Sequence, residues 1–242
     1  MSNRGTTSTG LWVEFQAAVL RQLPRPEDAE STVFEGWTKN QDALKSALAM
    51  ALLPSVSNLS DDIDWQKAYK VLGLEVEYAE FTKAGGVKED PNLWVVPVVK
   101  GVTCNKVVAT LRNLKVNVYT YVDDLDNGVP TNDRDLSNSS YAISFARAVE
   151  ADEANKNLSA NMLKKRDHKG ITLLERLLLE LGYFMATGKH LDERNATLCT
   201  GSRNSDGYIP YVYWSSVYRL VSVGCCSPGG RGGGLRSRSA VS

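Results

Sequence analysis

The chain has 242 residues, of which 43% are hydrophobic and 23% charged, an ordinary composition for one large globular domain or two small ones. Its 28 lysines and arginines balance its 28 aspartates and glutamates, so net charge gives no reason to expect binding to nucleic acid or to an anionic membrane. No stretch reaches the roughly 18 apolar residues of a membrane span, and the first residues lack the apolar region of a signal peptide. The 4 cysteines show no CxxC spacing, so we expect free thiols and a cytoplasmic location.

The first third of the chain predicts helices. Residues 1–9 are rich in serine, threonine and glycine, and we expect them to be disordered. Over residues 10–72, apolar side chains recur at helical spacing between prolines. This pattern predicts a helical cap of three short helices, followed by a fourth that begins near Asp64.

Residues 73–224 predict an α+β domain. The run 93–99 is typical of a strand, a helix capped by Thr103 follows it, and residues 116–122 alternate as the next strand. Strand, helix and strand form a βαβ-like unit, so we expect the two strands to be parallel neighbours.

The second half of this domain contains the clearest element, an amphipathic helix over residues 171–187 that ends at Gly188. A strand is expected at 141–150, and three more are expected after the helix, in ATLCTGS, YIPYVYW and VYRLVSV. The predicted fold is therefore α+β, with an N-terminal helical cap and a mixed β-sheet packed on the long helix. Residues 225–242, rich in glycine, arginine and serine, predict a flexible tail.

Several stretches are similar to sequences outside this chain. They are WTKNQDALKSAL from Trp37, KGITLLERLLLELGYFMATGKHLD from Lys169, LCTGSRNSDG from Leu198, and the closing LRSRSAVS. Together they resemble a group of uncharacterised proteins predicted from metagenomic, candidate-phylum bacteria. The resemblance covers most of the chain after about residue 35. It implies a bacterial, cytosolic origin and implies no activity, fold or catalytic residues.

An acidic strand end is the first candidate site. The stretch YVDDLD places Asp123, Asp124 and Asp126 directly after a predicted strand. Its YVDD resembles the metal-binding turn of reverse-transcriptase-type polymerases, and adjacent carboxylates suit Mg²⁺ or Mn²⁺. A polymerase would also need a second acidic strand and a basic channel, and the sequence predicts neither. The other interpretation is a solvated turn of Asp, Asn and Gly.

A second candidate pairs this turn with the acidic residues Glu150, Asp152 and Glu153. If the strands before these two segments are neighbours, Asp123, Asp124 and Glu150 could face one cleft. Two carboxylates roughly 5 to 9.5 Å apart are the catalytic pair of a glycosidase. With metal, the same residues could serve a phosphodiesterase.

The third candidate is an aromatic hairpin near the C-terminus. Tyrosine and tryptophan offer flat apolar faces with a polar handle, which suits a small-molecule, glycan or protein ligand. The alternative is that these aromatic side chains only stabilise cross-strand pairs. The candidate ligand-binding residues are Arg203, Asp206, Tyr211, Tyr213 and Trp214.

Two function classes follow from these patterns. The first is a cytosolic binding or interaction protein that uses the aromatic hairpin; the second is a carboxylate-dependent hydrolase, a glycosidase or metal-dependent phosphodiesterase. Nucleic acid is expected only as a weak partner of the Arg/Gly tail. The histidines His168 and His190 flank the long helix, so we expect them at opposite ends of it, where they do not share a metal.

Overall fold

A computed structural model of the chain describes residues 35, 38–40, 63–74, 76, 90–136 and 139–241. The chain divides into two compact units, Met1–Leu59 and Ser60–Ser242. In the first unit only residues 35 and 38–40 are described, so the predicted disordered N-terminus and most of the predicted helical cap lie outside the described residues. The fold and the candidate site belong to the second unit.

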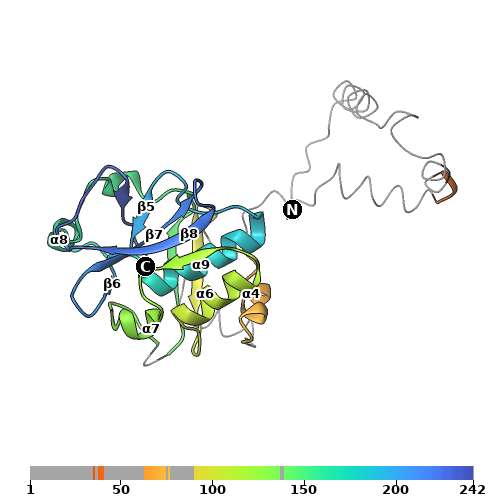
Figure 1. Cartoon of the computed structure of the whole chain (residues 1–242), viewed down its shortest axis with the longest axis horizontal. Coiled ribbons are helices and arrows are strands. Elements are labelled where there is room, and N and C mark those ends of the chain that lie inside the picture. The colour runs from red at the N-terminus through yellow and green to blue at the C-terminus, as the bar shows by residue number, and fades with distance from the viewer. Residues whose placement is uncertain are drawn as a thin grey trace, which may run out of the picture. The chain divides into compact units, whose positions relative to one another are not determined.

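The long helix α9 (Leu173–Thr187) lies at the centre of this unit (Figure 1). Its first turn is fixed by a capping box, in which the Thr172 hydroxyl accepts from the Glu175 amide and the Glu175 carboxylate accepts from the Thr172 amide. It ends at Gly188, whose φ of 68° is the left-handed conformation that glycine adopts most easily. The helix predicted over 171–187 is thus confirmed.

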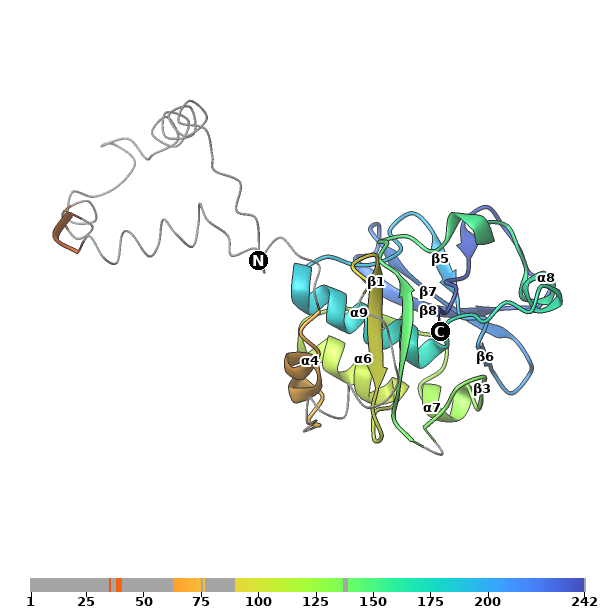
Figure 2. The ribbon, with the colours of Figure 1, turned by 180° about the vertical axis from the view of Figure 1, so that it is seen from behind.

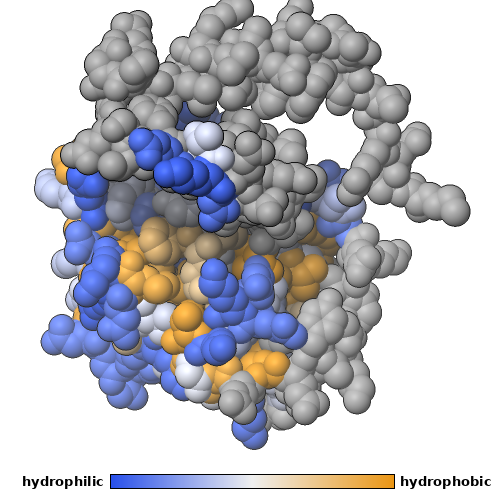
Figure 3. Space-filling view, turned by 90° about the vertical axis from the view of Figure 1, so that its right-hand side faces the viewer, coloured by the Kyte–Doolittle hydropathy of each residue, from blue (hydrophilic) through white to orange (hydrophobic). Residues whose placement is uncertain are grey.

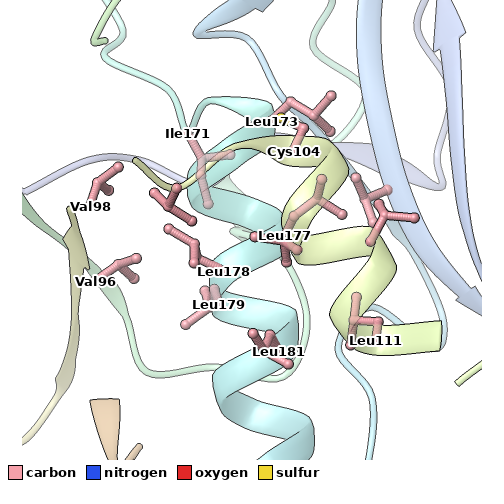
Figure 4. Packing of buried hydrophobic residues seen from close by; sticks show 14 of the residues in the cluster. Val96, Val98, Cys104, Leu111, Ile171, Leu173, Leu177, Leu178, Leu179 and Leu181 are labelled. Carbon is pink, nitrogen blue, oxygen red and sulfur yellow. The ribbon is translucent and has the colours of Figure 1, made fainter. Parts of the chain in front are cut away.

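Leucines on several sides of α9 are buried. Figure 4 shows Leu178 on the side of Val96 and Leu177 on the side of Leu111. Because apolar side chains point in more than one direction, the helix needs cover on more than one side. The structure provides that cover with strands on opposite sides and with two further helices.

The larger sheet is mixed and has five strands in the order β2-β8-β7-β5-β9. β7 and β8 form an antiparallel hairpin, whereas β2 pairs with β8, and β9 with β5, in parallel. The sheet confirms the three strands predicted after α9 and the mixed α+β fold. The bounds are β2 Val118–Thr120, β5 Ala196–Leu198, β7 Ile209–Ser215, β8 Leu220–Cys226 and β9 Leu235–Arg236.

A separate antiparallel pair, β1 (Leu93–Val98) and β4 (Tyr141–Ala146), forms a second, smaller sheet. The two views agree that this pair covers one side of α9 and the five-stranded sheet the other (Figures 1 and 2). The core therefore lies in a middle layer of helices between two sheets.

The predicted βαβ-like unit is wrong. The strands β1 and β2 flank a helix as expected, but they belong to different sheets and are not neighbours. β2 instead pairs with β8, so Val118 lies beside Val221. Sequence proximity favoured a local pairing, whereas the partner strand comes from the far end of the chain.

Two further helices complete the middle layer. α6 (Cys104–Asn113) begins at the predicted cap Thr103 and packs on α9. α4 (Trp65–Val71) begins at Asp64, as predicted, and also packs on α9. The predicted boundary after residue 72 is therefore misplaced, because α4 is part of the α+β unit.

On the face that Figure 3 shows, hydrophobic side chains are visible between hydrophilic ones, on the side of the molecule where α4 and α6 lie.

The remaining elements are short and lie outside the middle layer of helices. They are α7 Leu125–Gly128, β3 Thr131–Asn132, the 3-10 helix Glu153–Asn155, α8 Ala160–Lys165 and β6 Ser202–Arg203, of which β3 and β6 pair with each other.

The end of the chain is built into the fold, which corrects the flexible tail predicted over 225–242. β9 pairs with β5, and the side chain of Arg238 is buried. Arg238 donates to the carbonyls of Ala148 and Val149, at 2.7 Å each, and Ala240 donates its amide to the Lys169 carbonyl. The tail was predicted from composition alone. A segment rich in glycine, serine and arginine is typical of a flexible linker, and its composition does not show the hydrogen bonds it makes with distant parts of the fold.

Candidate ligand-binding site

The acidic strand end after β2 accepts hydrogen bonds from the first turns of two helices. Asp124 is the N-cap of α7 and accepts from the Asn127 amide at 3.0 Å and from the Asn105 side chain at 2.7 Å. These hydrogen bonds to the charged form lower the pKa of Asp124. Asp126 accepts from the amide of Asn105 in the first turn of α6. The two carboxylates therefore hold α6 and α7 together, a role that the sequence did not predict.

The structure does not give this turn a set of metal ligands. Asp123 is exposed beside these two carboxylates. Within the described residues, no group of three or more His, Cys, Asp or Glu side chains is placed to hold a metal ion. The predicted Mg²⁺ or Mn²⁺ site at Asp123, Asp124 and Asp126 thus gains no support from the fold.

The carboxylates predicted for a hydrolase come from two different sheets. β2 precedes Asp124, whereas β4 precedes Glu150 in the smaller sheet, so the assumption that these strands are neighbours is wrong. The Glu150 carboxylate accepts from the Arg194 amide at 3.1 Å and from the Asn195 side chain at 2.6 Å. It fixes the loop before β5.

The aromatic hairpin divides its side chains between the two faces of the larger sheet. Successive residues of a strand point to opposite faces, so Tyr211 and Tyr213 lie on one face of β7 and Trp214 on the other. The Tyr211 ring lies over Gly224 of the paired strand, where a Cβ atom would come within 2.5 Å of it. Tyr211 therefore forms a cross-strand contact, and Trp214 points to the other face of the sheet.

The two polar candidates of this hairpin also differ in their surroundings. Arg203 donates to the carbonyls of Thr200 and Ser202, at 2.7 Å each, and burial lowers its pKa. Asp206 is exposed in the turn before β7. Arg203 is thus engaged in fixing its own loop.

Trp214 stacks on His190. The two ring centroids lie 3.6 Å apart with planes only 10° from parallel, and the Phe184 ring covers the opposite face of the imidazole at 5.1 Å. Phe184 comes from the last turns of α9, His190 from the loop after it, and Trp214 from β7. The three rings form a continuous aromatic stack at the C-terminal end of α9.

A buried carboxylate fixes the orientation of the His190 ring. Nδ1 of His190 lies 2.8 Å from Oε1 of Glu180, a residue with no exposed surface. The other Glu180 oxygen accepts from Arg176 at 2.9 Å. Since Nδ1 is held by Glu180 and both ring faces are covered, the edge that carries Nε2 is the part of the imidazole left for other contacts.

Behind Glu180, a cluster of buried charges ties α9 to the end of the chain. Arg176 lies 2.8 Å from Asp192, which in turn accepts from Arg238 at 2.7 Å. Burial alone would raise the pKa of Asp192, but the charges of Arg238 and Arg176 outweigh it and lower the pKa. With Glu180, two cations and two anions balance within the protein interior, so the carboxylate that holds His190 is itself compensated.

A pocket of about 650 Å³ opens beside the aromatic stack. None of its lining residues is acidic, and two are cations. It is lined by Lys115, Val116, Asn117, Phe184, Gly188, His190, Trp214, Tyr218 and Arg219. A smaller hollow of about 300 Å³ is lined by Trp214 together with Tyr213, Ser216 and the Glu193–Ala196 segment.

Comparisons with protein families, curated proteins and solved structures found no match to this chain. In the described part of the chain, no helix is long and apolar enough to cross a membrane.

Sequence reasoning named one residue of the larger pocket as a ligand-binding candidate, Trp214, and placed His190 only at one end of the long helix. It missed Lys115, Phe184 and Arg219, because these come from separate segments that only the tertiary fold brings together. A local signal did exist for His190, which lies two residues after the helix stop at Gly188.

Proposed function

We propose that this protein binds a small ligand with a flat face in the pocket beside Trp214. The observation that carries the proposal is the stack of Trp214 on His190 at the wall of the pocket, with His190 held from behind by buried Glu180. A pocket of about 650 Å³ has the size of those that hold small molecules. Its aromatic and polar lining supports recognition of a planar ligand by stacking combined with a few directed hydrogen bonds.

The proposal keeps the binding function expected from the aromatic hairpin and changes the face that performs it. The site uses Trp214, on the helix-facing side of the sheet, and does not use Tyr211 or Tyr213. We also propose a cytoplasmic location, which the free state of all 4 cysteines supports. A bacterial origin stays a prediction.

The test is a binding screen by ligand-observed NMR with four probes, phenyl phosphate, benzoate, indole and adenosine. We expect at least one probe to bind and its affinity to fall by roughly tenfold in Trp214→Leu, because a stacking contact is lost. Tyr218→Ala should also weaken binding without affecting the fold, since Tyr218 lines the pocket and is 74% exposed.

Val217→Ala is the matched control, because Val217 is 82% exposed and does not line the larger pocket. Urea unfolding of each variant shows whether it is folded under the conditions of the screen. Failure of all four probes to bind, or undiminished binding in folded Trp214→Leu, would rule out the proposed site.

A further inference from the structure

We infer that the ligand of this pocket carries a phosphate or carboxylate group, and that Lys115 and Arg219 bind that group. The inference rests on the proposed function, because it assigns the chemical class of the ligand to the same pocket. It is supported by the charge of the lining, by the backbone conformation of the two cations and by the way they are held together.

The charge of the pocket is one-sided. Lys115 and Arg219 each carry a positive charge, and the lining has no carboxylate to neutralise them. Among the described residues, neither side chain has an ion-pair partner. A concave surface with charges of one sign concentrates ligands of the opposite sign, so the lining favours an anion.

Both cations occupy backbone positions that favour glycine. The φ angle is 67° at Lys115 and 51° at Arg219, in the left-handed region where a side chain is strained. Lys115 follows the C-terminus of α6, and Arg219 lies in the turn between β7 and β8. Two unrelated turns of this pocket thus both carry a long cationic side chain where glycine would cost less, which points to a use for the charge.

Asn117 connects the two turns. Its carbonyl accepts from the Val221 amide at 2.9 Å, and its side chain donates to the Arg219 carbonyl at 3.3 Å. This contact joins the segment after α6 to the β7–β8 turn, so the backbones that carry the two cations are fixed relative to each other. Because the two backbones are fixed, an anion that binds both side chains has less freedom left to restrict than if the turns moved independently.

The aromatic stack lies in the same pocket as the cations. A planar ligand can therefore place its ring against Trp214 and its anionic group near Lys115 and Arg219. Because Nδ1 of His190 is already bound to Glu180, the Nε2 edge remains for one directed contact to the ligand. The pocket therefore favours a ligand that carries an aromatic ring and an anionic group in one molecule.

The experiment compares two matched pairs of probes, phenyl phosphate with phenol and adenosine monophosphate with adenosine. We expect the charged member of a pair to bind at least about tenfold more tightly, as one charge-assisted hydrogen bond provides this difference. Added salt should weaken only the charged member.

The variants Lys115→Gly and Arg219→Gly remove each charge and at the same time relieve the strained backbone. We expect each to lose most of the preference for the charged probe and to melt within about 2 °C of the parent protein or above it. Asn157→Gly is the matched control, because Asn157 has a φ of 57°, is exposed and does not line the pocket. It should keep the parent affinity for both members of each pair.

The outcomes separate this inference from the proposed function. Equal binding of charged and neutral probes, or a preference that survives in the Lys115→Gly, Arg219→Gly double variant, overturns the inference and leaves the pocket as a binding site. If no member of either pair binds, the inference fails, and the proposed function fails with it when benzoate and indole do not bind either. Lys115→Gln and Arg219→Gln provide a second test, because they keep the length of the side chain and remove only its charge.

Discussion

At the scale of single residues, His168 shows how burial alone makes stability depend on pH. It is partly buried in the loop before α9, where its Nε2 lies 3.2 Å from the hydroxyl of Ser237. Burial lowers the pKa of His168 below its ordinary value of 6.5, and the charge of Asp152 opposes this only in part. The folded protein therefore accepts a proton at His168 less readily than the unfolded chain does.

We predict that the free energy of unfolding falls as the pH drops below 6.5, the ordinary pKa of histidine, because there the unfolded chain takes up the proton first. The loss continues down to the lowered pKa of the folded state. Urea unfolding at pH values of about 8 and about 5.5 measures it. In His168→Gln this part of the pH dependence should disappear, and an unchanged pH dependence in the variant would contradict the prediction.

At the scale of elements, the contact between α4 and α9 depends on one glycine. A Cβ atom added to Gly182 of α9 would come within 2.5 Å of Ile63 and 3.1 Å of Trp65, which lie next to and in α4. Helix propensity favours alanine over glycine by about 1 kcal/mol, whereas the close approach of these two side chains favours glycine at position 182.

We predict that Gly182→Ala lowers the free energy of unfolding by about 1 to 2 kcal/mol, because overpacking outweighs the gain in propensity. In an Ile63→Ala background, where the space is vacated, the same change should be neutral or stabilising. Denaturant unfolding of the four proteins of this cycle measures the coupling. If Gly182→Ala has the same effect in both backgrounds, the close approach of α4 is not what requires glycine.

The elements differ in how well sequence predicted them. The bounds of α6 and α9 followed from local patterns, namely the caps Thr103 and Gly188 and the spacing of leucines. The sheets did not, because strand pairing depends on contacts between distant segments. Val118 pairs with Val221, and no local signal distinguishes that pairing from the expected one with the preceding strand.

At the scale of the whole molecule, the candidate site exists only through long-range packing. Its wall comes from α9 and β7, its cations from two turns, and its support from the buried Glu180. When each of these residues is considered separately in the sequence, a structural role is enough to explain it. The acidic strand end shows the same limit in part: the cap bond from the Asn127 amide to Asp124 is local, whereas the bond from Asn105 comes from another helix.

The C-terminal segment has the largest consequence for the molecule as a whole. Arg238 is 1% exposed and bonds to Asp192, to Thr197 and to two carbonyls of the segment after β4. It thereby joins the smaller sheet, the loop after α9 and the larger sheet. Removing this side chain leaves those carbonyls and part of the Asp192 charge without a donor in the protein interior.

We predict that Arg238→Ala lowers the free energy of unfolding by about 3 to 5 kcal/mol, the range for breaking a buried ion pair. Arg231→Ala is the matched control, because Arg231 lies in the same glycine-rich segment and is exposed, so its loss should change stability by less than about 0.5 kcal/mol. Urea unfolding of both variants decides between the two descriptions of this segment. If the segment were a flexible tail, both substitutions would change the free energy of unfolding by equally small amounts. If it connects both sheets, only the loss of Arg238 lowers stability strongly.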